Sequence, residues 1–234
     1  MKLSERLYKA ASLIPDGAKF ADIGTDHGYV PVWLAIRGGA KRIVASDINA
    51  GPLNAAKINA EKYGVSDKIE FVLADGLDGI NGDVDTVLIA GMGGETIMAI
   101  LQNAPWLRDS GALLILQPQS KRRELTAWLY ANGYTIEDAS LVKDGGRIYT
   151  VLSVRAGENG ERAAADTLIL DILVSKRDSL VSEFLDILIK KYSAAVDGMK
   201  KSNSDNAETE EYFLSALKRL KTISKKEAEN AEFY

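Results

Sequence analysis

The stretch that decides the fold is Ala21-Asp22-Ile23-Gly24-Thr25-Asp26-His27-Gly28. An apolar strand at 19–23 runs into this glycine turn, a helix follows at 31–37, and a second apolar strand at 42–46 ends at Asp47. This order of elements is typical of the crossover unit that binds nucleotides in α/β folds. The glycines let the backbone approach the ligand closely. The acid at the second strand end can accept hydrogen bonds from both hydroxyls of a ribose.

The same turn indicates which nucleotide derivative it binds. Asp26 and His27 stand where a dinucleotide-binding turn has its middle glycine, so a carboxylate would lie where a pyrophosphate has to bind. Like charges repel at such short range. A ligand that carries an ammonium and a sulfonium is instead attracted to the carboxylate. The turn therefore predicts S-adenosyl-L-methionine as the cofactor.

Composition excludes several classes of protein. The 234 residues are 46% hydrophobic and 26% charged, and no apolar run approaches the roughly 20 residues of a membrane-spanning helix. The first six residues lack the apolar core of a signal peptide, so we expect a cytoplasmic protein. With no cysteine and a single histidine, we expect no metal centre. A net charge of −4 means that a nucleic acid would have to bind a local basic surface.

Apolar, β-branched segments alternate with amphipathic segments through the first two thirds of the chain. Such alternation predicts a doubly wound α/β fold, in which a Rossmann-like parallel sheet carries helices on both faces. A Gly-Gly turn at 145–146 joins the last two of seven strands and predicts an antiparallel hairpin. The predicted strands are 19–23, 42–46, 69–73, 86–89, 112–117, 135–142 and 148–155, and the predicted helices of this part are 3–13, 31–37, 52–63, 95–103 and 121–132.

The sequence changes character at the polar, glycine-containing segment 156–160. Beyond it, apolar residues recur at helical spacing from Leu168 to Tyr192, which predicts one long helix, and again from Phe213 to Ile223. The simplest arrangement is a coiled-coil-like helical hairpin of two or three antiparallel helices that share an apolar seam. We therefore predict a cofactor-binding domain at 1–157 and a C-terminal helical domain at 158–234.

Acids follow three consecutive strands of the predicted sheet. Asp47 ends the second strand, and Asp75 follows the third, where Gly76 lets the chain turn. Because ligands of open α/β sheets bind at the carboxyl ends of the strands, we expect Asp47 at the ribose and Asp75 at the adenine amino group. Helix capping is the alternative role for such acids. The residues predicted to bind the cofactor are Asp22, Gly24, Thr25, Asp26, His27, Gly28, Asp47, Ile48, Asn49, Asp75, Gly76, Ala90, Gly91, Met92 and Gly93.

Two further segments are candidates for the substrate. Three glycines occur between Gly91 and Gly94, more than a tight turn needs, and glycine costs conformational entropy on folding. They favour backbone that lies close to cofactor and substrate. Amide side chains after the fifth strand can read base edges, and the cations that follow can hold phosphates, although a solvated helix start explains the cations equally well. The residues predicted to contact the substrate are Tyr29, Gly94, Gln117, Pro118, Gln119, Lys121, Arg122 and Arg123.

Four motifs together resemble the bacterial tRNA (adenine 22-N1)-methyltransferase family. They are Asp22-Ile23-Gly24-Thr25-Asp26-His27-Gly28-Tyr29, Asp47-Ile48-Asn49, Ile89-Ala90-Gly91-Met92-Gly93-Gly94 and Gln117-Pro118-Gln119. The resemblance covers the whole chain, and it departs from the family at Gln119, where the family's motif ends in asparagine. It implies the class I methyltransferase fold, whose sheet closes with an antiparallel pair. It also implies S-adenosyl-L-methionine, tRNA as substrate and methyl transfer to N1 of an adenine in the D-arm region.

The chemistry that the resemblance implies needs few side chains. Adenine N1 carries a lone pair at neutral pH, so alignment and a negative potential near the base suffice, and Asp26 is the candidate catalytic residue. The base has to be flipped out of its helix to be reached. His27 could act as a general base, but a histidine at the first turn of a helix is more often structural.

Other functions stay open at this point. The chain could methylate a small molecule or a protein, or it could be a degenerate methyltransferase fold that serves as a binding module. A dinucleotide dehydrogenase is disfavoured by Asp26. We expect a monomer or a weak dimer.

Overall fold

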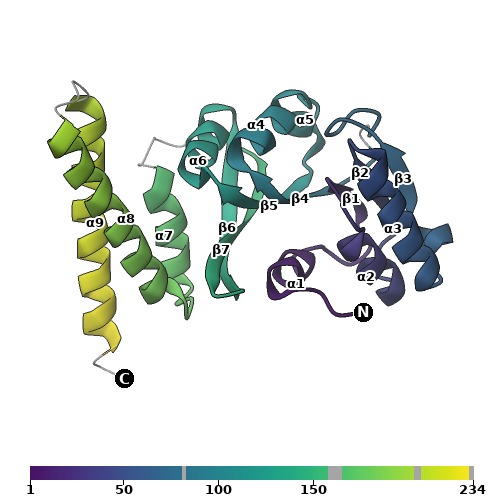
Figure 1. Ribbon diagram of the computed structural model, residues 1–234, viewed down its shortest axis with the longest axis horizontal. Helices are drawn as coiled ribbons and strands as arrows, with labels where there is room; N and C mark the ends of the chain where they lie inside the picture. Colours follow the sequence, from purple (N-terminus) through teal and green to yellow (C-terminus); the bar gives the residue numbers. More distant parts are fainter. Residues whose placement is uncertain (81–82, 158–164, 203–206, 232–234) are drawn as a thin grey trace. The chain divides into compact units, whose positions relative to one another are not determined.

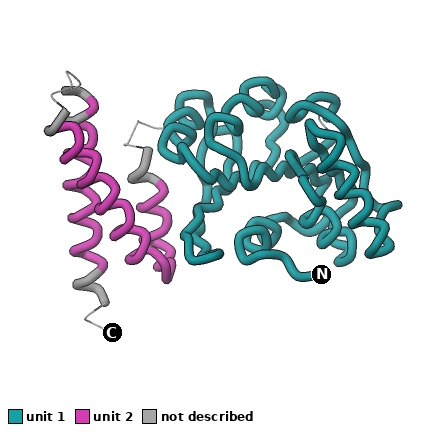
Figure 2. Tube along the Cα trace, in the orientation of Figure 1, with its two compact units in different colours: residues 1–161 teal, residues 162–234 magenta. Residues whose placement is uncertain are grey.

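The computed structural model describes residues 1–80, 83–157, 165–202 and 207–231. The chain divides into two compact units, residues 1–161 and residues 162–234 (Figure 2). Unit 1 contains all strands of the described residues, and unit 2 is helical. No helix in the described ranges is both long and apolar enough to cross a bilayer.

Unit 1 is built on a mixed sheet of seven strands in the order β3-β2-β1-β4-β5-β7-β6. The first five strands are parallel, and β7 runs antiparallel to both β5 and β6, so the predicted fold class is confirmed. The apolar runs of the central strands fit this arrangement because both faces of the sheet are covered. The strands are β1 (Lys19–Ile23), β2 (Arg42–Asp47), β3 (Glu70–Leu73), β4 (Thr86–Gly93), β5 (Leu113–Ser120), β6 (Tyr134–Asp144) and β7 (Arg147–Ala156).

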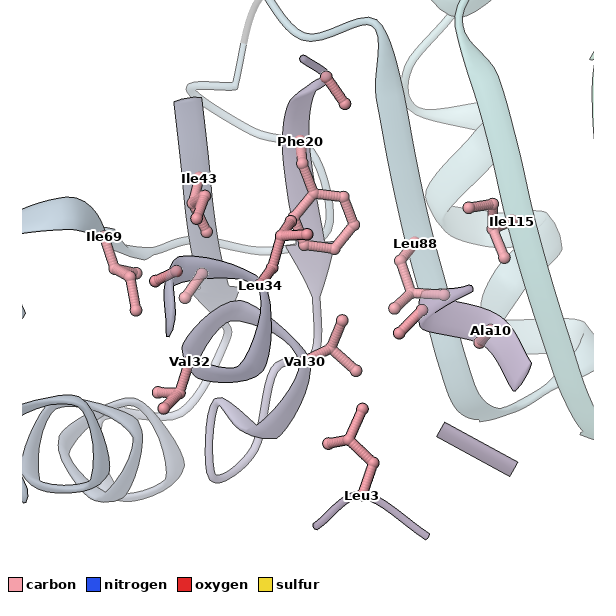
Figure 3. Close-up of a cluster of buried hydrophobic side chains, with 14 of the residues drawn as sticks. Leu3, Ala10, Phe20, Val30, Val32, Leu34, Ile43, Ile69, Leu88 and Ile115 are labelled. Atoms are coloured by element: carbon pink, nitrogen blue, oxygen red, sulfur yellow. The ribbon is translucent and has the colours of Figure 1, made fainter. Parts of the chain in front are cut away.

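Helices cover both faces of this sheet (Figure 1). The first three lie on one face and α4 to α6 on the other. On the first face, Phe20, Leu88 and Ile115 of the strands are buried in one cluster with Val30 and Leu34 of the second helix (Figure 3). Burying side chains of this size stabilises the fold by about 1.5–3 kcal/mol each. The helices are α1 (Glu5–Ala11), α2 (Tyr29–Arg37), α3 (Ala50–Lys62), α4 (Gly94–Gln102), α5 (Leu107–Ser110) and α6 (Arg122–Ala131), with a short 3₁₀ turn, η1 (Ser66–Lys68).

Unit 2 contains α7 (Ala165–Ser175), α8 (Val181–Ser202) and α9 (Ala207–Ala231). Tyr192 of α8 meets Phe213 of α9 edge to face, with ring centroids 5.1 Å apart. The predicted continuous helix from 168 to 192 is wrong, because the chain turns between α7 and α8. Arg177 takes a left-handed conformation at φ 52°, and the Asp178 carboxylate accepts a hydrogen bond from the Leu180 amide at 3.0 Å. A left-handed residue followed by this side-chain bond ends one helix and starts the next.

Gly28 sets the distance between α2 and α3. It begins α2 in a left-handed conformation, φ 65°, and a Cβ at this position would lie 2.8 Å from the Ala56 Cβ of α3. No pair of carbons packs that closely, so the two helices can only approach as they do because Gly28 has no side chain. Gly28 therefore has a packing role, and its place at the cofactor stays a prediction.

We expect Gly28→Ala to destabilise unit 1 more than Gly38→Ala does. Gly38 ends α2 at φ 74° with nothing within 4 Å of a built Cβ, so alanine there meets only backbone strain, about 1–2 kcal/mol. Alanine at position 28 adds overpacking, typically about 1–3 kcal/mol. Denaturant unfolding of both variants measures the difference. Equal losses would contradict the packing role.

Candidate functional site

A cavity of about 340 Å³ opens at the carboxyl ends of β1 and β4. These two strands are neighbours, but the chain continues from β1 towards β2 and from β4 towards β5, on opposite sides. Ligands of doubly wound folds bind at such a switch point. The lining residues are Arg6, Leu7, Asp22, Gly24, Thr25, Asp26, Tyr29, Val30, Ala90, Gly91, Met92 and Gln119.

A second, larger cavity of about 470 Å³ lies around the start of β2 and β3. Lys41, Arg42 and Glu70 are among its lining residues, and none of the predicted site residues is. Since ligands of open α/β sheets bind at the opposite ends of the strands, the smaller cavity is the candidate site.

Asp22 is a buried acid in the lining of this cavity. Its side chain is 6% exposed, and the Thr25 hydroxyl donates a hydrogen bond to Oδ2 at 2.8 Å. The pKa of Asp22 is raised from 3.8 to about 7, mainly because burial disfavours the charged form; the Thr25 bond lowers the pKa and the nearby Asp47 carboxylate raises it. At neutral pH both forms of this carboxyl are populated. A cationic group in the cavity would favour the charged form.

The burial of Asp22 has a consequence for stability against pH. The folded protein keeps this proton up to about pH 7, whereas the carboxyl of an unfolded chain loses it near its ordinary pKa of 3.8. The unfolded chain therefore binds fewer protons in this window, and the stability contributed by Asp22 falls as pH rises through it, by about 1.4 kcal/mol per pH unit.

We expect Asp22→Asn to remove this pH dependence. Asparagine keeps an oxygen for the Thr25 hydroxyl and carries no charge at any pH. Denaturant unfolding of both proteins at pH 5, 6 and 7 should show the parent losing stability relative to the variant as pH rises, because only the parent has a buried carboxyl to ionise. A stability difference between the two proteins that stays constant across this pH range would contradict a raised pKa of Asp22.

Asp47 ties together the loops after β1 and β2. It is 7% exposed at the end of β2, where Oδ2 accepts a hydrogen bond from the Asp26 amide at 3.1 Å and Oδ1 accepts one from the Asn49 amide at 2.9 Å. Each carboxylate oxygen can accept a second bond, so ribose hydroxyls can still be bound. Ile48, the next residue, is 59% exposed.

We expect Asp47→Asn to weaken S-adenosyl-L-methionine binding at least tenfold. The amide group has one acceptor oxygen where two N–H groups and a ribose need acceptors, and hydrogen bonds to a charged group contribute about 1.5–3 kcal/mol each. Calorimetry measures the affinity. Asp67→Asn, on the exposed η1 turn, is the control and should bind as the parent does. An unchanged affinity in the Asp47 variant would remove this residue from the site.

The first glycine turn carries three side chains that were predicted to take part in the site: Asp26, His27 and Tyr29. Asp26 is left-handed at φ 52°, its side chain is 67% exposed, and it lines the cavity together with Tyr29. The His27 ring lies 5.4 Å from the Tyr29 ring, and its backbone carbonyl accepts a hydrogen bond from Asn59 at 3.1 Å. His27 is not among the lining residues, which fits the structural role better than that of a general base.

The glycine loop of β4 is positioned by β5. β4 continues to Gly93, further than predicted, because Met92 and Gly93 still pair with Pro118 and Ser120 after register shifts. Gly91 has φ 82° and lines the cavity. A Cβ on Gly94 would lie 2.5 Å from the Lys121 carbonyl oxygen, so Gly94 lets the two loops approach. Asp75 and Gly76 follow β3, with Asp75 exposed.

The two predicted glutamines have different environments. Gln117 is fully buried, and its Oε1 accepts hydrogen bonds from Arg6 Nη1 at 2.6 Å and from the Gly91 amide at 3.1 Å. Its Nε2 donates to the Pro118 carbonyl at 3.3 Å. Gln119 is exposed and lines the cavity. Of this motif, Gln119 is thus the side chain that can meet a substrate.

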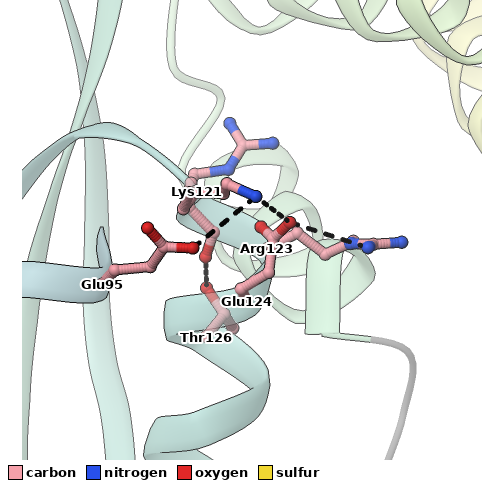
Figure 4. A network of polar contacts seen from close by, with 6 residues as sticks. Glu95, Lys121, Arg123, Glu124 and Thr126 are labelled. Atoms are coloured by element: carbon pink, nitrogen blue, oxygen red, sulfur yellow. Dashed lines mark hydrogen bonds and ion pairs between the residues drawn. The ribbon is translucent and has the colours of Figure 1, made fainter. Parts of the chain in front are cut away.

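The basic segment at the start of α6 is partly neutralised (Figure 4). Lys121 Nζ lies 3.7 Å from Glu95 and 3.9 Å from Glu124, and Arg123 lies 3.7 Å from Glu124. Arg122 reaches the Thr150 hydroxyl at 3.5 Å. Exposed ion pairs contribute about 0–1 kcal/mol, so phosphates could still compete for Lys121 and Arg123.

Sequence reasoning missed Arg6 and Leu7 of α1 and Val30 of α2, which also line the cavity. The local sequence carries no signal for Arg6, because the residues that it contacts lie more than a hundred positions away. The described residues contain no group of three acidic or histidine side chains that could hold a metal ion.

Known proteins resemble this chain over most of its length. A methyltransferase domain family matches residues 3–152. The chain is 35% identical over 194 residues to the tRNA (adenine(22)-N(1))-methyltransferase of Bacillus subtilis, which covers 82% of this chain and 81% of that protein. The chain belongs to the tRNA (adenine(22)-N(1))-methyltransferase family. The family resemblance predicted from the four motifs is therefore confirmed.

Solved structures of this family share the fold. The crystal structure of the B. subtilis tRNA methyltransferase TrmK superposes with a TM-score of 0.81 at 28% identity and covers 95% of this chain and 99% of that chain. TrmK of M. capricolum, in complex with the cofactor product S-adenosyl-homocysteine, has a TM-score of 0.76 at 26% identity, with 96% and 99% covered.

Proposed function

We propose that this protein transfers a methyl group from S-adenosyl-L-methionine to N1 of adenine 22 in tRNA. The observation that carries this function is the cavity at the β1–β4 switch point, where Asp22 and Asp26 face the same space. The names of the relatives given above specify methylation of this position of tRNA, and these relatives match most of the chain. tRNA is accordingly the expected partner, and we infer that the protein works in the cytoplasm.

The residues around the cavity fit this cofactor. Asp22 has no cation beside it among its described contacts, and burial raises its pKa, so a cationic ligand would relieve an unfavourable environment. Asp47 would hold the ribose and Asp75 the adenine amino group, as predicted from the strand ends. S-adenosyl-L-methionine supplies an activated methyl group when bound. These cofactor contacts and the division into domains at 1–157 and 158–234 stay predictions.

On the substrate side, the chain has to accept a flipped adenine. Adenine N1 has its lone pair free at neutral pH, and the base becomes positively charged when it is methylated. Asp26 at the mouth of the cavity supplies negative potential there. Tyr29 offers an exposed aromatic ring, and stacking of a base on such a ring contributes about 1–3 kcal/mol. Gln119 is the amide that can read a base edge.

The experiment that tests this function is nucleoside mass spectrometry of a tRNA transcript incubated with the protein and S-adenosyl-L-methionine. We expect 1-methyladenosine, and we expect none when adenine 22 is replaced by guanine. A methylated nucleoside of another kind, or 1-methyladenosine that persists in the guanine 22 transcript, would contradict the proposed function.

We expect Asp26→Asn to slow methyl transfer about tenfold or more, as loss of a group that stabilises developing charge does at other sites. Asparagine tolerates the left-handed backbone of Asp26, so the turn should keep its geometry. Single-turnover methylation at saturating cofactor isolates the chemical step, and Asp67→Asn again serves as the control. A near-normal rate would restrict Asp26 to cofactor binding.

A further inference from the structure

Arg6 of α1 lines the cavity together with Leu7, and it contacts residues of three strands. Its Nη1 donates to Gln117 Oε1 of β5 at 2.6 Å, and its backbone amide donates to Asp144 Oδ2 of β6 at 3.4 Å. The guanidinium carbon lies 5.8 Å from the centre of the Tyr149 ring of β7. A surface arginine needs no such set of contacts.

The partner of this guanidinium is a neutral amide. In the described part of the chain Arg6 makes no ion pair, although it is half-buried. Taking a cation partly out of water without an acid beside it is unfavourable. Gln117 orients the group, but it does not neutralise it.

The cavity lining carries charges of both signs. Arg6 is the single cation among the lining residues, and Asp22 and Asp26 are the acids. Arginine presents five N–H donors in a planar fork that matches the two oxygens of a carboxylate or phosphate, and the bond to Gln117 uses one of them. The remaining donors suit an oxyanion.

We propose that Arg6 binds an oxyanion in this cavity and is positioned for it by Gln117. The inference rests on the proposed function, which brings two oxyanions to the site: the methionyl carboxylate of the cofactor and a phosphate of the incoming nucleotide. Gln117 Oε1 also accepts a hydrogen bond from the Gly91 amide. The same buried oxygen therefore positions both the Arg6 guanidinium and the glycine loop.

The test compares S-adenosyl-L-methionine with its decarboxylated form, which differ only in the carboxylate. Calorimetry is done on the full chain as the parent, Arg6→Met, Arg6→Lys and the control Lys9→Met, which removes the same charge from the same helix outside the lining residues. If the oxyanion is the carboxylate, Arg6→Met should weaken the intact cofactor about tenfold to a hundredfold and leave the decarboxylated form unchanged. Arg6→Lys should fall between the parent and the methionine variant, because it keeps the charge without the fork.

The second arm measures tRNA binding at several salt concentrations. If the oxyanion is a phosphate, Arg6→Met should leave the affinities for both cofactor forms unchanged and weaken tRNA binding. The slope of log affinity for tRNA against log salt concentration should fall by about one. Equal weakening of both cofactor forms with normal tRNA binding would mean a structural role and would overturn the proposal, as would no change in either arm. Arg6→Lys gives the same comparison if the methionine variant does not fold. The cofactor arm needs no tRNA, so its failure is distinct from a failure to form 1-methyladenosine.

Discussion

The site depends on the two hydrogen bonds that the Asp47 carboxylate accepts from the backbone of neighbouring loops. One comes from Asp26 in the turn after β1, and the other comes from Asn49 at the start of α3. The first bond is made by the amide of a residue in the left-handed conformation that also lines the cavity. One buried acid thus fixes the loops of two adjacent strands, and the close contact of α2 and α3 at Gly28 keeps them at one spacing.

The sequence predicted the sheet well because its central strands are apolar on both faces and its turns carry glycine. It could not predict the extent of β4, since the pairing of Met92 and Gly93 with β5 depends on register shifts between distant segments. Nor could it separate Gln117 from Gln119. Residues two apart in a regular strand face the same side, yet the structure buries the first and exposes the second.

Two other features escaped sequence reasoning for similar physical reasons. The apolar spacing from 168 to 192 continues across the turn at Arg177 because α7 and α8 each bury one face, so periodicity alone does not reveal the break. Arg6 is one of several charges on a short helix, and its local sequence does not distinguish it from the others. Its contacts with Gln117 and Tyr149 join residues more than a hundred positions apart, and no local pattern predicts such pairs.

The place of α1 has a consequence for where the catalytic unit begins. A helix of seven residues has little stability of its own, so α1 keeps its position through contacts with the sheet. A version of the protein trimmed to start at β1 would retain every strand, yet it would lack Arg6, Leu7 and the buried Leu3. The smallest fragment with a complete cavity lining is therefore larger than the smallest fragment with a complete sheet.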